Sequence, residues 1–259
     1  MSGQRVAVVT GGSSGIGEET ARELARRGWH CVLLARRGDR LERVASEIGG
    51  EWELCDVSDR AQVEEVAARI LERHPAVALL VNNAGVPARG SFLEIDPELV
   101  ERVIDVNYLG GVWCLRAFLP GLQAAARAGG AHVVNLVSVA GTVAFAPAGA
   151  YAAAKHAQLA FSRSTASLLR GRGIQVHTVM PGFVETEGFP QHSVLSSRLM
   201  RRFVIEPDEV ATRMVDAVEK GKREITVPWF PYRLISIAQA LLPGVFARFA
   251  SASGYRKGT

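Results

Sequence analysis

The chain has 259 residues, of which 48% are hydrophobic and 22% charged, and its formal net charge is +4. This composition is typical of a well-cored protein with one large α/β domain or two small ones. The basic residues are scattered along the chain rather than gathered with aromatic residues, which argues against a nucleic-acid partner.

Signals for export or membrane insertion are not expected. No stretch reaches the length of a membrane span, and the strand-like run that begins at Arg5 leaves no room for a signal peptide. Cys31, Cys55 and Cys114 lie in apolar runs without metal-ligand spacing. We therefore expect reduced thiols, no metal site and a cytoplasmic protein.

Short apolar, β-branched runs alternate with helix-length amphipathic segments along almost the whole chain. The strand candidates are 5–10, 30–35, 52–57, 77–85, 131–139, 174–180 and 224–228. Continuous apolar strands separated by helices predict a parallel sheet covered on both faces. No linker rich in Pro, Gly or Ser divides the chain. The sequence therefore predicts a single doubly wound, Rossmann-like α/β domain over residues 1–259 with a seven-stranded parallel sheet.

The turn after the first strand is rich in glycine. The stretch VVTGGSSGIG (8–17) closes a strand and opens a helix near Ile16. Glycines at this position let the backbone approach a pyrophosphate at the positive end of the helix dipole. The context predicts a dinucleotide site. Its expected contacts are Gly11, Ser13, Ser14, Gly15, Ile16 and Gly17.

The second strand ends in LLARRGDR, with Arg36 and Arg37 where an acid would select NAD. Paired guanidinium groups suit the 2′-phosphate of NADP. We therefore predict NADP(H), with NAD(H) as the less favoured cofactor. The alternative is a solvated helix-start face without a cofactor role.

The stretch YAAAK places Tyr151 and Lys155 four residues apart, which puts them on one face of a helix. The pair could be a solvated surface pair or a proton-transfer device. The other motifs of the chain bear on that choice.

Six motifs occur in one order at characteristic intervals. They are TGGSSGIG, NNAG (82–85), Asn107 in DVNYLG, Ser138 in LVSVAG, YAAAK and PGFVET (181–186). Together they resemble the short-chain dehydrogenase/reductase family, over about residues 5–228. The resemblance implies an NADP-preferring oxidoreductase that acts on a CH–OH or C=O group.

The resemblance also implies four catalytic residues. Tyr151 would be the general acid/base, and Lys155 would lower the pKa of the phenol and bind the nicotinamide ribose. Ser138 would hold the substrate oxygen, unless it is only a turn former. Asn107 would hold a water in a proton relay, or else be a buried structural asparagine bonded to a neighbouring carbonyl.

Further cofactor contacts follow from the same family pattern. Asp56 would bind the adenine amino group, or cap a helix that begins near Ser58. Asn82 is expected to stabilise the sheet. The remaining contacts are expected at Val57, Asn83, Ala84, Gly85, Pro181, Gly182, Val184 and Thr186, in addition to Tyr151 and Lys155.

Residues 186–207 are expected to form a substrate lid. Together with the loop before Tyr151, the segment supplies an apolar wall, which favours a hydrophobic ketone, aldehyde or secondary alcohol. The expected wall residues are Val143, Phe145, Phe183, Phe189, Val194, Leu195, Leu199 and Met200. A 3-oxoacyl-thioester reductase is the alternative enzyme. A dinucleotide-binding redox sensor or scaffold without turnover is the alternative of another class.

The C-terminal tail, residues 229–259, is apolar and moderately amphipathic. It could cover the substrate pocket, pack on a partner subunit or touch a membrane surface, and packing is favoured over the membrane. The family resemblance implies a homodimer or homotetramer, with the helices around Asn107 and Tyr151 at the interface.

Overall fold

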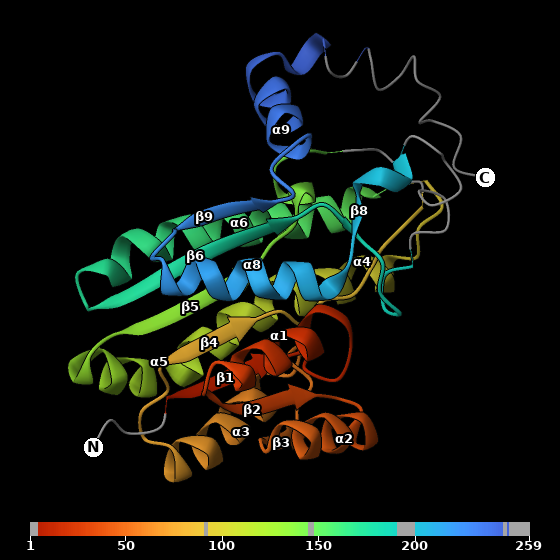
Figure 1. The fold of residues 1–259 in the computed structure, drawn as a ribbon. Helices are drawn as coiled ribbons and strands as arrows, with labels where there is room; N and C mark the ends of the chain where they lie inside the picture. The colour runs from red at the N-terminus through yellow and green to blue at the C-terminus, as the bar shows by residue number, and fades with distance from the viewer. Residues whose placement is uncertain (1–4, 91–92, 145–147, 191–199, 246–247, 249–259) are drawn as a thin grey trace.

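The computed structural model of the chain describes residues 5–90, 93–144, 148–190, 200–245 and 248 (Figure 1). Its centre is a seven-stranded sheet with the order β3-β2-β1-β4-β5-β6-β9. Each neighbouring pair of strands is parallel. The strands are β1 (Val6–Thr10), β2 (His30–Ala35), β3 (Glu51–Leu54), β4 (Leu79–Asn82), β5 (Ala131–Leu136), β6 (Ile174–Pro181) and β9 (Glu224–Val227).

The predicted doubly wound sheet is confirmed, and the strands differ from the predicted ranges mainly at their carboxyl ends. β4 ends at Asn82 and β5 at Leu136, several residues before the ends of their apolar runs. The strand order reverses between β1 and β4, which is the switch point where doubly wound sheets bind ligands. The residues that follow Asn82 and Leu136 therefore form loops at the carboxyl edge of the sheet, next to the switch point.

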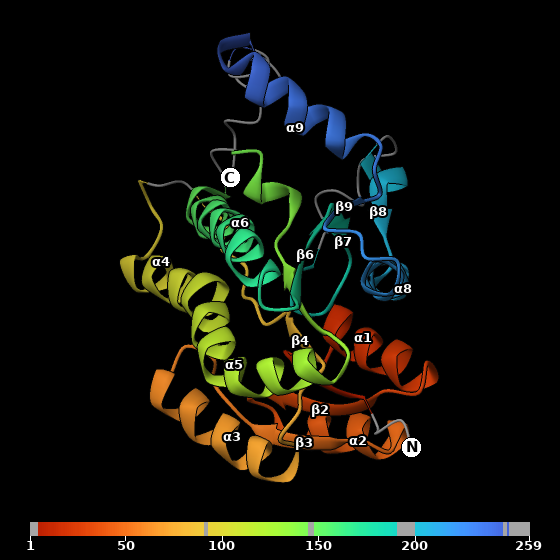
Figure 2. The same cartoon turned by 90° about the vertical axis from the view of Figure 1, so that its left-hand side faces the viewer.

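Helices cover both faces of the sheet (Figure 2). Apolar residues alternate between the two faces because strand side chains point to opposite sides with a period of two: Val8 packs with one core cluster, while Ala7 and Val9 pack with the other. One face carries α1 (Gly15–Arg26), α2 (Gly38–Ile48) and α8 (Pro207–Glu219). The other carries α3 (Arg60–Arg73), α5 (Gly110–Ala128) and α6 (Gly149–Arg170).

A π-helical turn at Asp105–Leu109 joins α4 (Pro97–Ile104) to α5. Single π turns inside α-helices are frequent at functional sites. Here the turn carries the buried side chain of Asn107. In the described part of the chain, no helix has the length and apolar character needed to cross a membrane.

Two short strands and helix α9 add to the elements described so far. β7 (Phe183–Val184) pairs with β8 (Val204–Ile205), which follows the 3-10 turn Met200–Phe203. Helix α9 (Tyr232–Leu241) follows β9 and projects from one end of the molecule (Figure 1).

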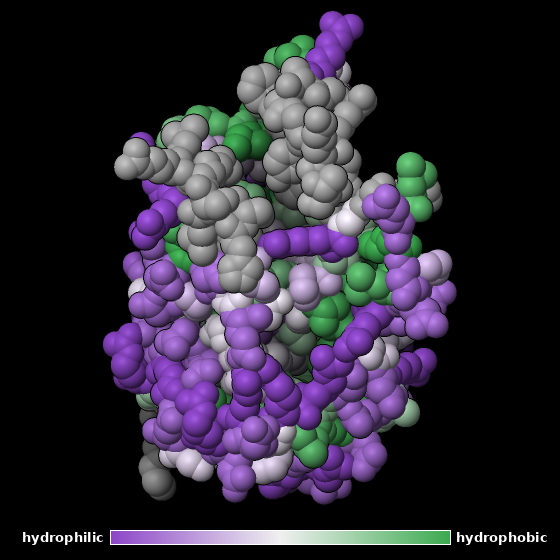
Figure 3. All heavy atoms as spheres, turned by 90° about the vertical axis from the view of Figure 1, so that its right-hand side faces the viewer, coloured by the Kyte–Doolittle hydropathy of each residue, from purple (hydrophilic) through white to green (hydrophobic). Residues whose placement is uncertain are grey.

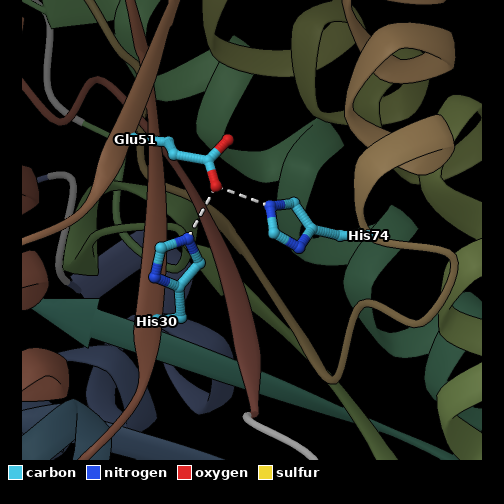
Figure 4. Close-up of side chains that lie close together, drawn as sticks. All are labelled: His30, Glu51 and His74. Atoms are coloured by element: carbon cyan, nitrogen blue, oxygen red, sulfur yellow. Dashed lines mark hydrogen bonds and ion pairs between the residues drawn. The ribbon is translucent and has the colours of Figure 1, made fainter.

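The amino edge of the sheet carries a cluster of two histidines and one glutamate (Figure 4). Nε2 of His30 and Nε2 of His74 lie 2.8 and 2.7 Å from Oε1 of Glu51. Arg73 donates from Nε to the second oxygen at 3.1 Å. Burial alone would raise the pKa of Glu51, but the hydrogen bonds from His30, His74 and Arg73 outweigh it and lower that pKa to about 2.

Candidate active site

A cavity of about 460 Å³ lies at the opposite, carboxyl edge of the sheet. The structure places on its wall every predicted cofactor and catalytic residue except Gly17 and Asn107. These residues are Gly11, Ser13, Ser14, Gly15, Ile16, Arg36, Arg37, Asp56, Val57, Asn83, Ala84, Gly85, Ser138, Tyr151, Lys155, Pro181, Gly182, Val184 and Thr186. Residues far apart in the sequence therefore meet around one cavity.

The glycine turn brings backbone close to backbone at the start of α1. Gly11 and Gly15 have φ of 67° and 56°, which side chains rarely adopt. A Cβ on Gly17 would lie 2.2 Å from the carbonyl oxygen of Gly11, so Gly17 allows the helix to pack on the turn. The structure thus gives Gly17 a packing position behind the turn rather than a place on the cavity wall.

Arg36 and Arg37 lie at the mouth of the cavity and are 49% and 42% exposed. Arg37 donates from Nη2 to the hydroxyl oxygens of Ser13 and Ser14, at 3.1 and 2.6 Å. It also lies 3.5 Å from Glu187, a carboxylate that pairs with Arg40 as well. Sequence reasoning missed Glu187, which lies 147 positions after Arg40 and meets it only in the fold.

Asp56 faces the cavity beside Arg36, whose Nη1 lies 3.5 Å from its carboxylate. Its Oδ1 accepts hydrogen bonds from the backbone N and the hydroxyl of Ser58, at 3.0 and 2.6 Å. Burial alone would raise the pKa of Asp56, but the hydrogen bonds from Ser58 and the nearby Arg36 outweigh burial and lower that pKa. Helix α3 begins later, at Arg60, and its capping side chain is Asp59, which accepts from Gln62 N at 3.1 Å. Asp56 therefore does not cap α3, and its carboxylate instead stabilises the turn at Ser58.

The NNAG segment ties β4 to its neighbours. Asn83 donates from Nδ2 to the carbonyl oxygen of Thr10 at 2.8 Å. The hydroxyl of Thr10 in turn accepts from the backbone N–H groups of Asn83 and Ala84, each at 3.0 Å. Asn82 donates to the side-chain oxygen of Asn135 on β5 at 2.9 Å, in line with its expected role in the sheet.

Asn107 is 1% exposed. The oxygen and the nitrogen of its side-chain amide both form hydrogen bonds with the backbone of Val86. Oδ1 accepts from Val86 N at 2.7 Å, and Nδ2 donates to Val86 O at 2.9 Å. This geometry matches the structural alternative, because the side chain fixes the loop that follows Gly85. The proton-relay role of Asn107 stays a prediction.

Ser138 ends the loop after β5 with a strained backbone. Its φ of 145° is the one positive value at a non-glycine residue in the described part of the chain, and such strain is concentrated at functional sites. Its hydroxyl accepts from Ala140 N at 3.1 Å and lies 3.5 Å from the carbonyl oxygen of Pro181. Ser138 lines the cavity and lies beyond the regular strand, which ends at Leu136.

Tyr151 and Lys155 lie on α6 beside Ser138. Burial raises the pKa of Tyr151 to about 12, and a hydrogen bond with Ser138 acts in the opposite direction. Lys155 is 4% exposed, and burial lowers its pKa to about 7. Its Nζ lies 5.8 Å from the centre of the Tyr151 ring. Both side chains therefore border one cavity with pKa values that depart from their ordinary values.

The partners of Lys155 are neutral oxygens. Nζ donates to Leu136 O at 2.9 Å and to Oε1 of Gln158 at 2.8 Å. Sequence reasoning missed Gln158, although its position three residues after Lys155 on the same helix face is a signal that could have found it.

The substrate side of the cavity is mostly apolar, although Arg89 also lines it and donates from Nη2 to Pro190 O at 2.8 Å. Phe183 and Phe189 line it as predicted, and the Phe189 ring makes an edge-on contact with Tyr151 at 5.8 Å between centres. Further apolar lining comes from Val86, Pro87, Ala88, Val139, Ala140 and Ala148. Val143 is buried but is not part of this lining.

Part of the predicted lid lies outside the described residues. Val194, Leu195 and Leu199 fall in that part, as does the side chain of Met200. Phe145, a predicted wall residue from the loop before Tyr151, also lies outside the described residues. The described segments, 186–190 and 200–207, include Thr186 and Phe189 on the cavity wall.

Gly182 lets α9 approach the cavity. A Cβ at this position would lie 2.1 Å from the ring of Tyr232, the first residue of α9. The Tyr232 hydroxyl accepts from Phe183 N at 3.2 Å and donates to Phe203 O at 3.0 Å. One face of the cavity wall is thus packed directly on α9.

Fold and site define a dinucleotide-binding oxidoreductase: a glycine turn opens α1 at the switch point of a doubly wound sheet, beside a Ser–Tyr–Lys group. The sequence matches the family described as short chain dehydrogenase over residues 5–193. The chain belongs to this family.

Individual relatives agree with that assignment. The chain is 33% identical over 243 residues to short-chain dehydrogenase/reductase 3 of Bos taurus, covering 91% of this chain and 78% of that protein. An actinorhodin polyketide ketoreductase with NADPH has a TM-score of 0.78 at 28% identity, covering 86% of this chain and 95% of that one. A short chain dehydrogenase/reductase from Burkholderia phymatum in complex with NAD has a TM-score of 0.76 at 28% identity, covering 99% and 96%.

Proposed function

We propose that the protein is an NADP(H)-dependent oxidoreductase that interconverts a hydrophobic ketone or aldehyde and the corresponding alcohol. The observation that carries the proposal is the meeting of Ser138, Tyr151 and Lys155 on the wall of the cavity that the glycine turn also borders.

The residues present fit a nicotinamide dinucleotide. The backbone of the glycine turn and the start of α1 suit its diphosphate, because N–H groups at a helix start bind anions. Asp56 and Val57 would hold the adenine, and Asn83 to Gly85 the adenosine. Residues 181–186 would hold the carboxamide side. The bound cofactor supplies or accepts the hydride at C4 of its ring.

Tyr151 would move the proton that accompanies the hydride. In reduction the carbonyl carbon gains a hydride and the carbonyl oxygen gains the phenol proton; in oxidation both transfers run backwards. The hydroxyl of Ser138 would hold the reacting oxygen. The Lys155 ammonium, one helical turn away, would stabilise the phenolate that remains.

The preference for NADP(H) rests on Arg36 and Arg37. Both guanidinium groups are half-exposed at the cavity mouth, where a 2′-phosphate would be reached. The carboxylate of Glu187 lies 3.5 Å from Arg37, which indicates that an anion is accepted at this place. One solved relative is in complex with NADPH and another with NAD, so the comparisons do not decide between the two cofactors. The proposed preference therefore depends on Arg36 and Arg37.

The apolar lining around Phe183 and Phe189 supports a hydrophobic substrate. A 3-oxoacyl-thioester reductase is the second candidate, supported by the likeness to a polyketide ketoreductase. By resemblance to the family we further propose a homodimer or homotetramer, and a cytoplasmic location.

The first test is a fluorescence titration of the purified protein with NADPH and, separately, NADH. We expect NADPH to bind more tightly, followed by consumption of NADPH, measured by absorbance, with apolar ketones and aldehydes in a substrate panel. Preference for NADH would overturn the cofactor assignment alone. Binding of neither cofactor at high micromolar concentration would overturn the oxidoreductase itself. Cofactor binding without turnover of any carbonyl would favour the redox-sensor alternative.

A further inference from the structure

Helix α9 turns its polar side inward. Besides the contacts of Tyr232, the hydroxyl of Ser236 lies 2.7 Å from that of Thr142, and Oε1 of Gln239 accepts from Ala144 N at 3.2 Å. Tyr232 and Ser236 are the buried residues of α9. The hydrogen-bonding side of the helix is therefore the side that docks on the loop after Ser138 and on the cavity wall.

The opposite side of α9 is apolar and exposed. Leu234, Ile237 and Leu241 recur at intervals of three and four residues and are 47%, 43% and 73% exposed. The flanking residues Trp229, Phe230, Leu242 and Val245 are between 57% and 61% exposed. A surface helix normally buries its apolar stripe, so this arrangement is the reverse of the usual one. Figure 3 shows hydrophobic side chains at the top of the molecule, the end at which Figure 1 places α9.

Arg233 on α9 lies 3.8 Å from the carboxylate of Glu224, and the sequence that follows Glu224 carries only cations. From Ile225 to Thr259 the sequence contains no aspartate or glutamate, while its cations are Arg233, Arg248, Arg256 and Lys257. Arg233 lies on α9 and Arg248 is exposed. Such cations, together with the apolar stripe, suit a surface that is apolar below and anionic above, which is the make-up of a bilayer with anionic lipids.

We propose that α9 and its flanking residues form a lipid-docking face that seats the protein on an anionic bilayer. The face consists of Trp229, Phe230, Leu234, Ile237, Leu241, Leu242 and Val245. The helix has 10 residues, and at 1.5 Å per residue it spans about 15 Å, half of a hydrocarbon core of about 30 Å. It therefore lies in the plane of the surface, with Trp229 and Phe230 at the level of the headgroups, where amphipathic aromatic rings collect.

The position of this face connects it to the cavity. Tyr232 begins α9 and makes an edge-on ring contact with Phe183, at 6.0 Å between centres, and Phe183 lines the cavity. Seating on a bilayer would thus hold the substrate side of the cavity close to dissolved apolar molecules. This consequence for substrate supply depends on the proposed function, whereas the docking itself does not.

The test is flotation of the full chain with vesicles of phosphatidylcholine, with and without about a third of phosphatidylglycerol. We expect binding to the anionic vesicles that weakens with salt. The triple variant Leu234→Gln, Ile237→Gln, Leu241→Gln should reduce the bound fraction at least tenfold. The single variant Leu168→Gln is the matched control, because this leucine is 66% exposed on α6, and it should bind like the unaltered chain.

Circular dichroism and the thermal midpoint of the triple variant establish that it is folded. Absence of flotation with either vesicle would overturn the proposal. A dimer that forms without vesicles and is lost in the triple variant would overturn it as well, because the face would then be covered by a second copy. Turnover of a water-soluble ketone without vesicles should be unchanged in the triple variant. This assay fails if the proposed function is wrong, while the flotation result is unaffected.

Discussion

The two edges of the same sheet use ionisable side chains in opposite ways. At the amino edge, Glu51 receives hydrogen bonds from His30, His74 and Arg73, and its pKa is lowered. At the carboxyl edge, Lys155 is bonded to neutral oxygens and burial lowers its pKa to about 7. A charge with complementary partners is held in one state and contributes to stability. A buried charge without them changes state easily, which proton transfer requires.

The strongest test of this contrast is Tyr151→Phe. Removal of a general acid/base typically lowers a rate by about 10²- to 10⁴-fold, so we expect kcat to fall within that range. The dissociation constant of NADPH, measured by fluorescence, should change by no more than about twofold, because the aromatic ring remains in place. A hundredfold loss of affinity would require the loss of about 2.7 kcal/mol of binding free energy. Unchanged turnover would remove Tyr151 from the mechanism.

The next variant, Lys155→Met, should reduce kcat/KM by about 10- to 100-fold, since it removes the cation that stabilises the phenolate. Because burial lowers the pKa of Lys155 to about 7, kcat/KM for reduction should fall as the pH rises through that value in the unaltered enzyme. The same limb should be missing in the variant. A profile that keeps the limb would assign the titration to another group.

The double variant Arg36→Asp, Arg37→Ile tests the mouth of the cavity. Charge-assisted hydrogen bonds contribute about 1.5–3 kcal/mol each, so the ratio of NADPH to NADH affinity should drop by about tenfold or more. The two dissociation constants are measured by fluorescence. Lys220→Gln serves as a control, because that lysine pairs with Asp216 on α8, away from the cavity wall. An unchanged ratio would show that the arginines do not select the cofactor.

The smallest effect is expected at the amino edge. The pKa of Glu51 is lowered from 4.5 to about 2, so its contribution to stability is present above pH 4.5 and is lost as the pH falls toward 2. Because the carboxylate is one-third exposed, solvent screening limits that contribution to about 1 kcal/mol or less. Glu51→Gln should therefore lower the unfolding midpoint at pH 6, and the difference should shrink below pH 4.

Two controls accompany this measurement. Glu42→Gln, at an exposed position of α2, should leave the midpoint unchanged at both pH values. The ligand atoms of His30, Glu51 and His74 lie within 4.8 Å of one another, which also meets the spacing of a cation site. Since the hydrogen bonds complete the cluster, we expect a chelator to have no effect on the midpoint. A chelator-sensitive midpoint would instead identify a bound metal.

Much of the fold could be predicted because its signals are local. Buried parallel strands are continuous apolar runs, and the glycine turn after β1 requires positive φ at Gly11 and Gly15. The cavity wall followed from these signals and from motif order, because carboxyl ends of parallel strands meet at one edge.

The features that sequence reasoning missed depend on contacts between distant segments. The expectations for Asn107 include a buried structural asparagine but not its partner Val86, because the two residues lie 21 positions apart and nothing near either one encodes the pairing. Glu187 reaches Arg37 only after the whole sheet is assembled. The sequence of α9 places polar and apolar residues on different sides of the helix. Only the fold shows that the polar side packs against the rest of the protein.

The contact between Gly182 and Tyr232 joins α9 to the cavity wall. The tyrosine ring occupies the space that any side chain at position 182 would need. Because this ring packs against the backbone, a rotation of α9 would press on the segment that follows β6, and a rearrangement of that segment would press on α9. Through this joint, a force applied to the outside of the protein at α9 would be transmitted to the place where the substrate is held.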